Sequence, residues 1–447
     1  MLRTAAGGIG MTAFSMLAAK DAFGSFGQSA LHHPARAKRM IFLFMGGGPS
    51  QVDTFDPKPA LLDWQGKELT VPNARNAGYP FALPSAYKFA KHGESGIEIS
   101  ELFSEVAKCA DDLCVIRSMC CDDNNHPGGT RQMMTGFNRA RRPSFGAWLH
   151  YGLGTENENL PGYVVMGDAT RIGSNSWSSN FLPANNQGTP IRVGKDPIRN
   201  SKPGLPPNDQ RNQLDLIAAM NRRHSETALN DDRLEARIEA AELAFRMQSE
   251  APEATDITKE SEATQKLYGV DSSNAEQRLF ASQLLGARRL LERGVRVVQV
   301  HQHGREWDHH GQLKSKLKAS AYAVDKPIAG LLKDLKSRGL LDDTLVLWGG
   351  EFGRTPTSQG PDMDSRAHYP TAFTMWMAGG GVKAGHVHGR TDEFGCNIEE
   401  GRMHVHDLHA TILHLMGLDH ERLTFSYGGR EQTLTDVHGE VVTDLLA

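Results

Sequence analysis

The stretch that decides the fold reads Leu345-Val346-Leu347-Trp348-Gly349-Gly350-Glu351-Phe352-Gly353-Arg354-Thr355-Pro356. It starts with four apolar residues without alternation, which predicts a strand buried on both faces of a parallel sheet. Two glycines then allow a sharp turn at the carboxyl end of this strand. Because ligands bind at the carboxyl ends of strands in open α/β sheets, Glu351 is a candidate metal or substrate ligand. The alternative is an exposed glutamate in a glycine-rich turn.

Residues 39–45 are nearly all apolar and predict another central parallel strand. The glycine-rich loop that follows, residues 46–59, contains Asp53 and Asp56. Neither GxGxxG nor GxxxxGKS/T occurs in this loop, which argues against a nucleotide-binding role. Asp53 is therefore the candidate ligand at this strand end, while Asp56, which precedes a proline, is typical of a turn.

A third strand is predicted at residues 113–119 and leads into the polar segment 122–136. This segment enters a helix, and the free N–H groups at a helix N-terminus make a good anion site. His126 and Thr130 lie in this segment and are the candidate catalytic residues. The alternative for His126 is a solvent-exposed side chain or a helix cap.

The richest candidate site follows the strand predicted at residues 295–300. Residues 301–310 contain four histidines and one aspartate, and imidazole and carboxylate groups are common ligands of transition metals. Asp308 and His310 are the favoured metal ligands, because the chain direction separates the five side chains. A histidine-rich surface loop is the alternative. His368 is a further candidate, in a loop that returns toward the sheet before another apolar strand.

The composition limits the class of protein. With 39% hydrophobic and 23% charged residues among 447, the chain is typical of a soluble globular protein with a large core. Its net charge of -4 gives no reason to expect a nucleic acid or an anionic membrane as partner. Its five cysteines indicate neither a disulfide scaffold nor a CxxC zinc site.

Three regions are predicted along the chain. Residues 1–37 are expected to be an export signal and linker, since the apolar run at 5–19 is too short for a stable membrane span. Its first residues resemble the segment after the paired arginines of a twin-arginine signal, and those arginines are missing from this start. We expect a periplasmic or extracellular protein, and a buried N-terminal helix is the alternative. Residues 38–447 form one α/β domain, with a cap insertion predicted at about 160–275.

Several of these motifs resemble known families. Residues 339–353 resemble the sulfatase pattern of a Gly-Leu-x-Asp-Asn-Thr strand ending in Asp-His-Gly, and residues 126–136 resemble the sulfatase nucleophile segment. The closer likeness is to the bacterial family called domain of unknown function 1501, which belongs to the alkaline-phosphatase superfamily. The motifs that carry it are Gly-Gly-Pro-Ser-Gln-x-Asp-Thr-Phe-Asp-Pro-Lys-Pro, Trp-Asp-x-His and Gly-Glu-Phe-Gly-Arg-Thr-Pro.

The resemblance implies a fold and a cofactor. The fold would be a three-layer α/β/α sandwich with a mainly parallel sheet, like that of alkaline phosphatases and sulfatases. The cofactor would be a metal centre, often of two divalent ions (Zn, Ca, Mg or Mn), held at the strand ends. Carried over by position, the metal ligands would be Asp53, Asp308, His310, Glu351 and His368.

Two positions depart from the patterns of these families. The nucleophile position of sulfatases holds His126 here rather than Cys, Ser or Thr, which excludes a formylglycine mechanism. The family usually has an aspartate before its last histidine, whereas this chain has Ala367.

These features predict an exported metal-dependent hydrolase of sulfate or phosphate esters, on a small molecule or a polysaccharide. His126 would act as nucleophile, acid or ligand. The alternative is a non-catalytic exported binding or scaffold protein, because fold does not imply function.

Overall fold

The structure is a computed structural model, and it describes residues 31–72, 79–167, 173–194, 196–198, 205–225, 232–302 and 307–447. The export signal predicted from the apolar run at 5–19 lies outside these residues. Within the described part of the chain, no helix is both long enough and apolar enough to cross a bilayer.

A mixed, mainly parallel sheet forms the middle of the domain. In spatial order its strands are β12 (His386–His388), β4 (Leu113–Cys120), β11 (Phe373–Ala378), β8 (Thr344–Gly349), β1 (Arg39–Phe44), β7 (Val297–His301), β5 (Tyr163–Gly167) and β6 (Thr189–Pro190), and β15 (Met403–His404) also pairs with β4. Strand β11 runs antiparallel to both of its neighbours, and all other pairings in this sheet are parallel. The predicted α/β class with a mainly parallel sheet is confirmed.

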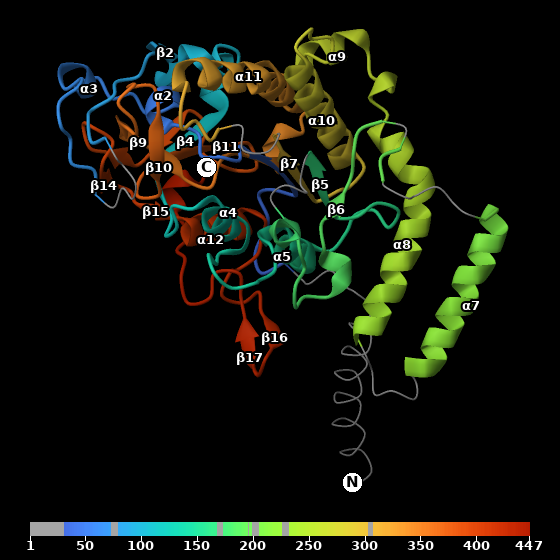
Figure 1. Cartoon of the computed structure of the whole chain (residues 1–447). Helices are drawn as coiled ribbons and strands as arrows, with labels where there is room; N and C mark the ends of the chain where they lie inside the picture. The colour runs from blue at the N-terminus through green and yellow to red at the C-terminus, as the bar shows by residue number, and fades with distance from the viewer. Residues whose placement is uncertain are drawn as a thin grey trace, which may run out of the picture.

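Helices cover both faces of this sheet (Figure 1). Successive residues of β1 alternate between two cores, with Ile41 and Leu43 in one and Phe42 and Phe44 in the other. The unbroken apolar run of β1 therefore reflects burial on both sides, in a three-layer arrangement. The first core includes helices α10 (Ala275–Glu292) and α11 (Leu313–Ser337), and the second includes α4 (His126–Thr135), α5 (Phe145–Leu153) and α12 (Val405–Leu415).

The region predicted as a cap insertion begins inside the sheet. Strands β5 and β6 belong to this region, and it leaves the sheet with α7 (Pro207–Ser225) and α8 (Asp232–Thr255). The two helices lie side by side (Figure 1) and are joined by an ion pair of 2.6 Å between Arg211 and Glu242. Helix α8 also contacts α10, which connects the pair to the domain.

The register of the central strands places three strand ends level with one another. Phe44, the last residue of β1, pairs with Gly349 of β8 on one side and with His301 of β7 on the other. The loops that follow β1, β7 and β8 therefore leave the sheet from the same edge. Two of these loops carry the candidate ligands Asp308 and Glu351.

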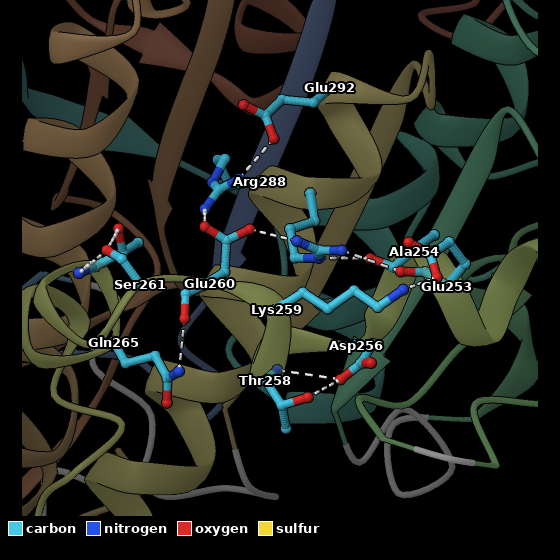
Figure 2. Close-up of polar contacts among 12 residues, drawn as sticks. Glu253, Ala254, Asp256, Thr258, Lys259, Glu260, Ser261, Gln265, Arg288 and Glu292 are labelled. Carbon is cyan, nitrogen blue, oxygen red and sulfur yellow. Dashed lines mark hydrogen bonds and ion pairs between the residues drawn. The ribbon is translucent and has the colours of Figure 1, made fainter.

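A buried network of ion pairs fastens α10 to its neighbours. The side chain of Arg288 is 1% exposed, and its guanidinium lies 2.6 Å from a carboxylate oxygen of Glu260 and 2.6 Å from one of Glu292. Figure 2 shows these two carboxylates on either side of Arg288. Asp334 of α11 completes the surroundings at 2.9 Å, and Glu260 also contacts Arg289.

We expect Glu260→Gln to lower the free energy of unfolding by about 3 kcal/mol, because it removes a carboxylate shared by two buried guanidinium groups. Urea and thermal unfolding of the full chain measure this loss. The matched control is Glu262→Gln, since Glu262 pairs with Lys266 on the surface and its loss should have a much smaller effect. Equal stabilities of the two variants would contradict a stabilising role of the network.

Candidate metal centre

Four side chains from distant parts of the chain meet at this edge of the sheet. His126 is the first residue of α4, His368 lies in β10 (Arg366–Tyr369), and Asp308 and His310 follow β7. Their ligand atoms, three imidazole nitrogens and one carboxylate oxygen, all lie within 4.8 Å of one another. The structure thus brings three of the predicted metal ligands together with the predicted catalytic histidine, and metal binding by them stays a prediction.

The geometry centres on a single oxygen atom of Asp308. Its Oδ1 lies 2.8 Å from Nε2 of His310 and 3.1 Å from Nε2 of His126. Nε2 of His368 is 3.2 Å away, and the buried guanidinium of Arg354 adds a nitrogen at 2.6 Å. Burial opposes the charged form of Asp308, but hydrogen bonds from His126 and from the guanidinium of Arg354 hold the pKa of its carboxyl far below its usual range. Asp308 is therefore a carboxylate and a good ligand for a divalent cation.

In His368 and His310, the contact made by Nδ1 shows whether Nε2 is available to bind a metal ion. Nδ1 of His368 lies 2.7 Å from the backbone oxygen of Asn124, which can only accept, so Nδ1 carries the proton. Nδ1 of His310 contacts Oε1 of Gln359 in the same way. Burial lowers the pKa of His368 and favours a neutral ring with one proton, so its Nε2 offers a lone pair.

The lone pair on Nε2 of His368 faces two other atoms that can accept a proton or bind a cation. Nε2 of His368 points its lone pair at the carboxylate of Asp308 and lies 2.9 Å from Nε2 of His310. Converging lone pairs repel one another unless a proton or a cation lies among them. Histidines that bind metals have their second nitrogen held by an acceptor, as these two do. The donor set therefore fits a divalent metal ion.

His126 lies between two carboxylates. Its Nδ1 is 2.6 Å from Oε1 of Glu351, and its Nε2 faces Asp308. Burial favours the neutral ring of His126, but the hydrogen bonds to Asp308 and Glu351 raise its pKa above the ordinary value. Glu351 was predicted as a metal ligand, and the structure places it behind His126, where it orients the ring.

Gly47 holds Glu351 in this position. Its backbone N–H lies 3.0 and 3.1 Å from the two carboxylate oxygens of Glu351. Its φ is +113°, and a Cβ at this residue would lie 2.6 Å from the backbone nitrogen of Asp308. A glycine is therefore required where the loop after β1 passes between the two acidic residues.

Asp53, the predicted ligand after β1, lies in α2 (Gln51–Thr54) and is not brought into the group of four. Its carboxylate oxygens lie 2.8 and 3.2 Å from two nitrogens of Arg366, and both side chains are buried. The hydroxyl of Ser50 donates to the same carboxylate at 2.6 Å. Ligation of a metal by Asp53 would require this pair to open.

Thr130 and Arg354 lie in the same two segments as His126 and Glu351. Thr130, the second predicted catalytic residue, lies one helical turn beyond His126 in α4 and is buried, but it is not in the group of four. Arg354, which contacts Asp308, was not predicted as a site residue. Its place three residues after Glu351 in the same strand-end motif was the available signal.

The chain matches the model of the family described as "Protein of unknown function (DUF1501)" over residues 37–446, and it belongs to that family. This confirms the family predicted from the sequence motifs. No curated protein matches the chain.

Solved structures with a similar fold include a sulfatase, an alkaline phosphatase and a zinc-bound periplasmic domain. The PsFucS1 sulfatase from Pseudoalteromonas sp. has a TM-score of 0.37 and 12% identity, with 86% of this chain and 68% of that chain covered. The alkaline phosphatase from the Antarctic bacterium TAB5 has a TM-score of 0.34 and 10% identity, covering 85% and 98%. The C-terminal periplasmic domain of EcEptC from Escherichia coli, in complex with Zn, has a TM-score of 0.35 and 11% identity, covering 88% and 87%.

Proposed function

We propose that this protein is an exported, metal-dependent hydrolase of phosphate or sulfate esters, including esters on polysaccharides. The observation that carries the proposal is the convergence of three imidazole Nε2 atoms on Oδ1 of Asp308. The arrangement lies at the carboxyl edge of a mainly parallel sheet, where α/β proteins bind their ligands.

The types of ligand atom limit which divalent ions suit the site. Magnesium and calcium prefer oxygen ligands, whereas imidazole suits zinc and its neighbours among the transition metals. Three nitrogens and one oxygen therefore favour zinc, with manganese as the next choice among the divalent ions predicted. When bound, the ion would supply Lewis acidity toward an ester oxygen.

The surrounding residues suit an anionic substrate. His126 opens α4, and the positive end of a helix favours an incoming phosphate or sulfate group. Arg354 offsets the charge of Asp308 and is held by the backbone oxygen of Gly48 at 3.0 Å. The rings of His310 and His368 are 38% and 16% exposed, so solvent and substrate reach the group from their side.

One observation favours the non-catalytic alternative. Four protein donors are enough to fill a tetrahedral coordination shell, as in structural zinc sites, whereas catalytic zinc keeps one position open. A binding or scaffold protein would need only the structural form of the site.

Measuring ester hydrolysis by the metal-loaded full chain distinguishes a hydrolase from a non-catalytic binding or scaffold protein. We expect the zinc- or manganese-loaded protein to hydrolyse aryl phosphate or aryl sulfate esters, to lose this activity with a chelator and to regain it when the ion returns. A chain that holds its full metal complement, binds a sulfated or phosphorylated glycan and turns over none of these esters would support the alternative.

Export is the second part of the proposal, and it rests on the apolar run at residues 5–19 and the small residues after it. We expect mass spectrometry of the protein from its native cells to find a mature N-terminus between Ala19 and Ala37. An intact Met1 in the cytoplasmic fraction would contradict export.

A further inference from the structure

A second group of metal-ligating side chains lies at the outer edge of the sheet. His386 and His388 are the first and last residues of β12, and they meet Asp444 near the end of the chain. Residues two apart on a strand point to the same face, which is why both rings reach one carboxylate. Nε2 of His386 and Nδ1 of His388 lie 2.8 and 2.9 Å from Oδ2 of Asp444.

The hydrogen bond of Nε2 shows which ring nitrogen of His388 carries the proton. Nε2 lies 2.9 Å from the backbone oxygen of Gly401, which can only accept a hydrogen bond. A neutral His388 therefore carries its proton on Nε2, and its Nδ1 turns a lone pair toward the carboxylate of Asp444. Gly401 has φ of +62°, and a Cβ there would lie 3.0 Å from Nε2, so the close approach of this backbone requires glycine.

We propose that His386, His388 and Asp444 bind a divalent transition-metal ion, with zinc preferred. Two imidazoles and one carboxylate are a common set of protein ligands for zinc, and the backbone acceptor behind His388 is the usual partner of a metal-bound histidine. Tetrahedral zinc ligands lie about 3.3 Å apart, so Oδ2 of Asp444 needs to move only slightly away from each of the two nitrogens. The side chain of Asp444 is 50% exposed and has room for this adjustment.

The second group is separate from the first. Strands β4, β11 and β8 lie between β12 and β1, which puts β12 about 19 Å from β1 at the usual strand spacing. The other oxygen of Asp444 lies 3.4 Å from Nζ of Lys383, which leaves Oδ2 directed at the two rings. Neither site shares a residue with the other.

A metal at this place would join the sheet edge to the last residues of the chain. The backbone already links them, since the N–H of Lys383 donates to the oxygen of Leu445 at 2.8 Å and that of Ala447 to Gly381 at 3.0 Å. Strand β12 is short and lies at an edge, where few hydrogen bonds hold a strand in place. The ion would therefore stabilise the pairing of this edge and the fold of the final segment.

The test uses the untagged full chain, stripped with a chelator and titrated with zinc chloride. To isolate the second site, Asp308→Asn is the background, and zinc per chain is counted by elemental analysis. Adding Asp444→Asn to this background is expected to remove one zinc per chain and to abolish the rise in melting temperature on zinc addition. Adding Asp436→Asn instead, another aspartate of the C-terminal segment, is the matched control and should change neither readout.

An equal zinc count with and without Asp444→Asn would overturn the proposal and leave an ion pair between Asp444 and a protonated His388. The comparison holds even if Asp308→Asn retains metal at the first site, because the difference between the two chains reports the second site alone. Asp444 is half exposed, so the variant is expected to fold, and its circular dichroism spectrum verifies this.

Discussion

Replacing Asp308 by asparagine is expected to empty the first metal site and to abolish ester hydrolysis. The carboxylate oxygen on which three imidazoles and Arg354 converge becomes a neutral amide, so the cation loses its only anionic ligand in the group of four. A ligand that binds only the folded state stabilises it, by about 4 kcal/mol when its free concentration is roughly a thousand times its dissociation constant. Metal content, turnover and thermal stability should therefore fall together.

A chelator separates the loss of metal from the loss of a buried partner for Arg354. The chelator should lower the melting temperature of the wild-type protein and leave that of Asp308→Asn unchanged, because the variant has no metal at this site to lose. Any effect of the second group is removed by making the comparison in an Asp444→Asn background. A wild-type metal content in Asp308→Asn would contradict the assignment of Asp308 as a ligand.

Asp53→Asn is the informative companion variant. The sequence motif predicts Asp53 as a metal ligand, whereas the structure pairs it with Arg366. If Asp53 serves only to pair with Arg366, the variant loses stability and keeps its metal. If Asp53 is also a metal ligand, the variant loses the metal as well. Elemental analysis of the variant distinguishes the two.

Replacing His126 by alanine is expected to have the second large effect. Its Nε2 is aimed at the same oxygen as the other two imidazoles, so we expect metal content and turnover to fall together. If the metal stays and the rate falls at least about a hundredfold, His126 transfers a proton instead, since general acid–base catalysis contributes roughly 10²–10⁴-fold. If both the metal and the rate are retained, His126 is neither a metal ligand nor a proton-transfer residue.

Two variants serve as controls for His126. Glu351→Gln leaves the ring of His126 with a weaker hydrogen-bond acceptor. Loss of such a supporting partner typically lowers metal affinity by about 10–100-fold, and we expect a decrease of this size. Thr130→Val removes the hydroxyl of the other predicted catalytic residue while keeping its volume. Because Thr130 lies outside the group of four, this variant should keep its metal, and its rate measures whether the hydroxyl has any part in the reaction.

The burial of the central strands followed from local pattern, whereas their order in the sheet was not predicted. The apolar run of β1 has no polar face, and a strand of this kind is stable only when both faces of its sheet are covered, which the two cores around Ile41 and Phe42 provide. The strand ends marked by Asp308 and Glu351 were visible for the same reason, because polar residues directly after such a run must lie at the sheet edge.

The sequence by itself thus determined the α/β class, the edge of the sheet that carries the site and most of the side chains found there. Only the tertiary structure decided which group each carboxylate meets. Asp53 pairs with Arg366 across 313 residues and Glu351 with His126 across 225, and no local pattern encodes such a choice. A carboxylate can bind a guanidinium, an imidazole or a metal, so its partner depends on which of these groups the packed core brings within reach.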